Sequence, residues 1–98
     1  MKFKEAVGKV IGCLQRGDYQ HEPRKDINTK NKLHTQEKSP AEVIEIVKCC
    51  PGTYHKTSPH DADRSVLVHE LTAQGRYKGW YIKFYFVADG TTFISVHQ

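Results

Sequence analysis

The chain has 98 residues, of which 15 are lysine or arginine and 11 are aspartate or glutamate, so its formal net charge is +4. This length suits a single domain over residues 1–98, so we expect one modest core and no second domain. The positive charge, which six histidines increase below neutral pH, favours a polyanionic partner without identifying it.

The first predicted element is an amphipathic helix over residues 2–16. Its apolar residues, from Phe3 to Leu14, recur at helical spacing, and Gly17 follows as a stop. Charged residues interrupt this apolar stretch, so it matches neither a secretory signal nor a membrane span. We therefore expect a cytoplasmic protein without a membrane partner.

The next segment, residues 18–38, is almost wholly polar and predicts a long loop that includes at most a short helix. Its basic part includes Arg24 and Lys25. A solvated loop and a clamp on a nucleic-acid backbone explain this basic part equally well. On the second interpretation, Arg24 and Lys25 bind the substrate.

A second helix is predicted to begin at Ser39-Pro40-Ala41-Glu42, which combines an N-cap serine, a proline at the first helical position and a glutamate at the third. Pro51-Gly52 ends it. Strands are predicted at roughly 53–57, 65–71, 80–87 and 92–97. The predicted fold class is therefore α+β, in which the two helices of the N-terminal half pack on one face of a C-terminal antiparallel sheet of about four strands.

The last two predicted strands have chemically different faces, because successive strand side chains alternate. One face places aromatic and aliphatic side chains in the core: Trp80, Ile82, Phe84, Phe86, Ile94 and Val96. The other face carries Phe93 together with a polar set: Tyr81, Lys83, Tyr85, Ser95 and His97. A phenol, an ammonium and an imidazole are thereby expected side by side on adjacent strands.

These polar residues suit the cleavage of RNA without a metal or a cofactor. Such cleavage needs a base for the ribose 2′-hydroxyl, an acid for the leaving oxygen and cations for the charge on the phosphate. The catalytic candidates are Lys56, His69, Tyr81, Lys83 and His97. The candidates for substrate binding are Arg24, Lys25, His60, Arg64 and Tyr85.

Each candidate also has a structural interpretation. The polar strand face is equally consistent with an ordinary solvated surface, and His97 with a frayed chain end. His69, which alternates with Leu67, suits a half-buried histidine slightly better than a catalytic one. The acidic residues around His60 are explained by a turn at least as well as by a metal site.

Five short runs in residues 42–98 resemble the MqsR family of bacterial toxins, which belongs with the RelE, barnase and colicin type (BECR) of ribonucleases. The runs are Thr53-Tyr-His-Lys56-Thr-Ser, Ala62-Asp-Arg64, Val66-Leu-Val-His-Glu-Leu71, Gly79-Trp-Tyr-Ile-Lys83 and Phe93-Ile-Ser-Val-His97. The resemblance implies a RelE-like fold of two helices and one sheet, cleavage of messenger RNA without a metal, and a cognate antitoxin.

The resemblance also implies roles for individual residues. Lys56 and Tyr81 stand where the family has an essential lysine and a strand tyrosine, and Lys83 follows two residues later. His97 stands where the family has a lysine. The family's tryptophan and glutamine correspond to Leu67 and Val68 here, so that part of the site is absent unless His69 replaces it.

The leading hypothesis is a metal-independent endoribonuclease, an mRNA interferase that is the toxin of a toxin–antitoxin system. In it His97 and His69 supply the base and the acid in either order, and Lys56 and Lys83 stabilise the phosphorane. Tyr81 orients the phosphate or stacks a base. The alternatives are a non-catalytic nucleic-acid-binding module, a secreted or phage-borne ribonuclease toxin of the same fold, and a small partner-binding protein.

Overall fold

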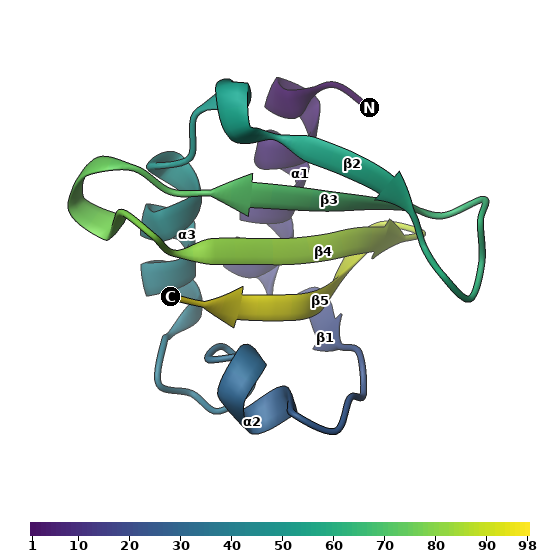
Figure 1. Ribbon diagram of the computed structural model, residues 1–98, viewed down its shortest axis with the longest axis horizontal. Helices are drawn as coiled ribbons and strands as arrows, with labels where there is room; N and C mark the ends of the chain where they lie inside the picture. Colours follow the sequence, from purple (N-terminus) through teal and green to yellow (C-terminus); the bar gives the residue numbers. More distant parts are fainter.

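The computed structural model describes residues 1–98 and has two main layers, a five-stranded sheet and the helices α1 and α3 behind it (Figure 1). No helix is both long and apolar enough to cross a membrane. The helices are α1 (Phe3–Arg16), α2 (Ile27–Lys30) and α3 (Pro40–Lys48). The strands are β1 (Tyr19–His21), β2 (Lys56–Pro59), β3 (Leu67–Thr72), β4 (Tyr81–Val87) and β5 (Gly90–His97).

The strand order across the sheet is β1-β5-β4-β3-β2. The pairs β2–β3, β3–β4 and β4–β5 are antiparallel, whereas β1 lies parallel to β5. The predicted α+β class is confirmed, but the predicted sheet of about four antiparallel strands is corrected to a mixed sheet of five. The additional strand and α2 both come from residues 18–38, where elements of only three and four residues leave no recognisable periodicity.

A β-bulge in β5 decides which side chains enter the core. Lys83 pairs with Ser95, but the next residue, Phe84, pairs with Phe93, so Ile94 is an extra residue on β5. As a result Phe93 faces α1 and α3 and is fully buried, in contrast to its predicted place on the polar face. The predicted positions of Lys83 and Ser95 on the polar face are unaffected.

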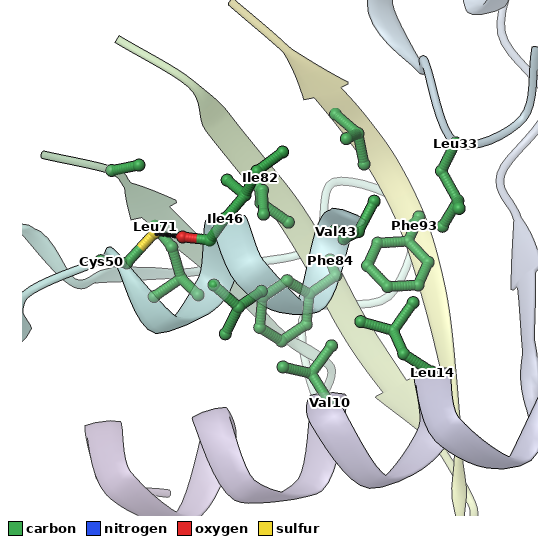
Figure 2. Close-up of a cluster of buried hydrophobic side chains, with 13 residues drawn as sticks. Val10, Leu14, Leu33, Val43, Ile46, Cys50, Leu71, Ile82, Phe84 and Phe93 are labelled. Atoms are coloured by element: carbon green, nitrogen blue, oxygen red, sulfur yellow. Dashed lines mark hydrogen bonds between the residues drawn. The ribbon is translucent and has the colours of Figure 1, made fainter. Parts of the chain in front are cut away.

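The core lies between the sheet and the two long helices (Figure 2). Phe84 and Phe93 contribute its largest side chains, and Val10 of α1 and Ile46 of α3 join the same cluster from the helical layer. This packing covers one face of the sheet. The other face, here called the open face, has neither α1 nor α3 over it (Figure 1).

The N-terminus of α3 has the capping box that its sequence predicts. The Ser39 side chain accepts a hydrogen bond from the Glu42 backbone N–H at 3.2 Å, and the Glu42 carboxylate accepts one from the Ser39 backbone N–H at 3.1 Å. Replacing Ser39 by alanine is expected to lower the free energy of unfolding by about 1 kcal/mol, because an N-terminal amide of α3 loses its acceptor. Urea unfolding measures this loss; Ser39→Asp keeps an acceptor, and an equal loss in both variants would contradict this explanation.

Candidate nucleic-acid site on the open face

A line of polar and charged side chains crosses the open face at right angles to the strands. Lys56 of β2 pairs with Glu70 of β3, Glu70 pairs with Lys83 of β4, and Lys83 pairs with Ser95 of β5. Arg24 extends the line, since its guanidinium donates to the Ser95 hydroxyl at 2.8 Å and to the Ile94 carbonyl at 3.2 Å. We call this line the charged row; its members are Lys56, Glu70, Lys83, Ser95 and Arg24.

The charged row offers free cations on both sides of a carboxylate. Adjacent strands lie about 4.8 Å apart, so the backbone positions of Lys56 and Lys83 are about 10 Å apart with Glu70 between them. None of the ion pairs in the structure includes Lys56 or Lys83. Both ammonium groups are thus available to an anion that binds over the row.

Tyr81 and His97 lie beside the charged row, where β4 pairs with the end of β5. Their ring centres are 5.5 Å apart, and the Tyr81 hydroxyl donates a hydrogen bond to the Glu70 carboxylate. Burial, followed by this contact with Glu70, raises the pKa of Tyr81 above its ordinary value. Tyr81 therefore keeps its proton near neutral pH and holds the Glu70 carboxylate in place.

A cleft of about 500 Å³ lies on the other side of Lys83, between residues 22–24 and the connection that follows β2. One oxygen of Glu22 accepts hydrogen bonds from the His60 ring at 2.6 Å and from the Tyr85 hydroxyl at 2.8 Å. The cleft also exposes Arg24 and Lys83. It therefore combines two cations with a carboxylate that is fixed by two donors.

The hydrogen bonds of His60 define which of its two ring nitrogens carries the proton. The Ala62 backbone N–H donates to His60 Nδ1 at 3.0 Å, so Nδ1 is the acceptor and Nε2 carries the proton directed at Glu22. Both ring nitrogens are thus engaged. Burial, followed by the hydrogen bond to Glu22, raises the pKa of Tyr85. These contacts favour a structural role of His60 and Tyr85 at the cleft over a role as acid or base.

The structure separates His69 from the other catalytic candidates. Its side chain lies in the core, on the face opposite Tyr81, Lys83 and His97, and it is only 2% exposed. The ring stacks on Phe84 and shares a hydrogen bond of 3.0 Å with His55. This corrects the expectation that His69 and His97 act as an acid and a base on one phosphate.

The remaining candidates differ in position. Glu70 is brought together with Lys56, Tyr81, Lys83 and His97. Arg24 and His60 line the cleft, and Tyr85 contacts two of its lining residues, Glu22 and His60. Lys25 and Arg64 are exposed and do not line the cleft.

Sequence reasoning did not include Glu70 or Glu22 among the candidates. Glu70 had a usable signal, because it alternates with the buried His69 and Leu71 and must face away from the core. Glu22 had no such signal, since its partner His60 lies 38 residues further along the chain. Its role depends on the placement of β1 at the sheet edge.

The structure was also searched for a metal-binding cluster, and the chain was compared with known proteins. No group of three or more histidine, cysteine, aspartate or glutamate side chains could hold a metal ion. Comparison with protein-family models, curated proteins and solved structures gives no match to the chain.

The buried His69 makes the stability depend on pH. Burial, with smaller contributions from His55 and the N-terminal amine, lowers its pKa from 6.5 to about 4. Between these values the unfolded chain binds a proton that the folded protein does not, so lowering the pH from 6.5 to 4 should decrease the free energy of unfolding, by up to about 3 kcal/mol. The pKa values of His55 and His21 are lowered too and act in the same direction.

Urea unfolding at several pH values across this interval measures the dependence. The His69→Gln variant retains a polar group next to His55 but does not titrate, so its stability should fall less steeply as the pH decreases. Equal pH dependence in the native protein and in His69→Gln would show that His69 is not responsible.

Proposed function

We propose that the protein is a metal-independent endoribonuclease, whose active site is the charged row of the open face with Tyr81 and His97 beside it. The observation that carries this proposal is the register Lys56–Glu70–Lys83, which sets a carboxylate between two unpaired ammonium groups. RNA cleavage by the 2′-hydroxyl uses this combination, because a base must act next to a phosphate whose negative charge increases.

Each residue has one role in the proposed reaction. The Glu70 carboxylate takes the proton of the ribose 2′-hydroxyl, and the 2′-oxygen attacks the adjacent phosphorus. Lys56 and Lys83 stabilise the negative charge of the phosphorane. Protonated His97 then gives its proton to the leaving 5′-oxygen as the P–O5′ bond breaks. The products are a 2′,3′-cyclic phosphate and a 5′-hydroxyl, and Tyr81 positions Glu70 throughout.

The cleft next to Lys83 supports the same proposal as a binding region. Arg24 is oriented by hydrogen bonds to β5 and by an ion pair with Asp26 at 2.6 Å, so its guanidinium is held in place before a substrate arrives. A pre-oriented guanidinium can bind a phosphate with two parallel hydrogen bonds. Arg24 and Lys83 therefore suit the phosphate that neighbours the reacting one.

The biological role that we propose is that of the toxin in a toxin–antitoxin system, acting on messenger RNA. It rests on the MqsR-like runs of the sequence, which include Lys56, Tyr81 and Lys83. An acidic antitoxin that covers the open face would inhibit the enzyme by blocking the charged row. Growth arrest on expression of the native protein, but not of the His97→Ala variant, is the expected result in cells.

Incubation of the purified protein with a long single-stranded RNA in EDTA tests the proposed activity. The native protein should fragment the RNA, and His97→Ala should not. RNA that is bound but left intact by the native protein would contradict the proposal and support the alternative, a non-catalytic nucleic-acid-binding module.

A further inference from the structure

Residues 22–32 run along the free edge of β5 and bring basic side chains to the rim of the open face. The Glu22 backbone N–H donates to the Phe93 carbonyl at 2.9 Å, and the Lys32 backbone N–H donates to the Val96 carbonyl at 2.7 Å. Between these two points lies α2, which packs on β5 (Figure 1). The segment that the sequence predicts to be a long loop is therefore a fixed border of the sheet.

A groove of about 340 Å³ opens where this border reaches the end of β5. Its walls include Lys30 and Lys32 on the α2 side, and Trp80 and His97 on the side of the sheet. Lys32 forms an ion pair with Glu37 at 3.5 Å, whereas Lys30 forms none. The Lys32 ammonium also donates to the Asn28 carbonyl at 3.1 Å, and Glu37 is largely exposed. A pair with an exposed carboxylate contributes little to stability, so another anion can replace Glu37.

We infer that this groove is a subsite for an unpaired nucleotide of the substrate RNA, whose base stacks on Trp80 and whose phosphate binds Lys30 and Lys32. The Trp80 indole is half-buried, and the Lys38 ammonium lies 5.2 Å from its ring centre, so a base stacks on the part of the ring that lines the groove. An indole edge beside two ammonium groups offers a stacking surface and a backbone contact together, as single-stranded nucleic acid requires. The inference rests on the proposed function, because His97 lines the groove and also lies beside the charged row.

The position of His97 indicates which nucleotide of the substrate occupies the subsite. In the proposed reaction His97 protonates the 5′-oxygen that leaves, so the nucleotide in the groove is the one that follows the cleaved bond. Its base must be unpaired, because stacking on Trp80 uses a face that a double helix covers with neighbouring bases. The substrate is thus single-stranded at least on that side of the cleaved bond.

Trp80 is the only tryptophan of the chain, so its fluorescence reports directly on the groove. The probe is a short single-stranded RNA of mixed sequence in which every ribose carries a 2′-O-methyl group, which blocks attack by the 2′-oxygen. We expect saturable quenching of Trp80 by this RNA and none by the same sequence in a fully paired duplex. Binding of the single strand, measured by anisotropy, without any change in Trp80 fluorescence would overturn the inference.

Lysine variants test the phosphate contact in the same titration. Lys30→Ala should weaken binding and reduce the magnitude of the slope of log K against log salt concentration by about 0.7, the loss of one phosphate contact on a single strand. The matched control is Lys48→Ala, which removes the same charge from an exposed position of α3 and should leave the slope unchanged. Equal effects of the two substitutions would contradict a specific contact at Lys30.

The fate of unmodified RNA separates this inference from the proposed activity. Quenching that depends on Lys30, in a protein that leaves unmodified RNA intact, would support the subsite and overturn the nuclease. Cleavage of unmodified RNA without quenching of Trp80 would support the nuclease and overturn the subsite.

Discussion

Replacing Glu70 by glutamine is expected to slow RNA cleavage by about 10²- to 10⁴-fold, the usual contribution of a general base. The glutamine side chain has the same shape and can still accept a hydrogen bond from Tyr81, but it cannot take a proton from the 2′-hydroxyl. The affinity for uncleavable RNA should not decrease, because the substitution removes a negative charge from between Lys56 and Lys83. Initial rates and binding isotherms for the same RNA measure both quantities.

The control for this variant is Glu45→Gln, which makes the same chemical change on α3, where Glu45 forms only an exposed ion pair with Lys48 at 3.8 Å. This substitution lies on the helical layer and should leave the cleavage rate unchanged. If Glu70→Gln cleaves RNA as fast as the native protein, Glu70 is not the base.

Replacing Phe84 by alanine is expected to decrease the free energy of unfolding by about 3–5 kcal/mol, through lost burial and the cavity that remains. The Phe84 side chain is fully buried between the sheet and the helices, with its ring centre 5.5 Å from those of His69 and Phe86 and 6.1 Å from that of Phe93. Because a domain of this size is typically stable by about 5–15 kcal/mol, the loss is a large part of the total.

Urea unfolding measures the effect of Phe84→Ala, and Val87→Ala on the same strand is its control. Val87 is 50% exposed, so its truncation should change the free energy of unfolding by no more than about 0.5 kcal/mol. Similar losses in the two variants would contradict the position of Phe84 in the core.

The regular elements could be predicted from the sequence because their signals are local. The apolar spacing that ends at Gly17 and the capping box at Ser39 each depend on neighbouring residues, and the observed helices Phe3–Arg16 and Pro40–Lys48 follow them. The alternation along Tyr81–Val87 also places Lys83 on the polar face, as predicted.

The features that sequence reasoning missed depend on contacts between distant segments. The bulge at Ile94 arises from the pairing of β4 with β5, and it moves Phe93 into the core against a simple alternation. The contact of Glu22 with His60 requires β1 at the sheet edge, and the three residues of β1 are too few to predict a strand. The burial of His69 against His55 agrees with the half-buried interpretation that its alternation slightly favoured, whereas its place among the catalytic candidates is wrong.

The ends of the cleavage products formed in EDTA show whether the 2′-hydroxyl attacks the phosphate. The native protein is incubated with a single-stranded RNA and, separately, with DNA of the same sequence, and the product ends are identified by mass spectrometry. We expect RNA fragments that end in a 2′,3′-cyclic phosphate and begin with a 5′-hydroxyl, with the DNA intact because it has no 2′-hydroxyl. Intact RNA, cleaved DNA or fragments with 5′-phosphate ends would contradict the proposed reaction.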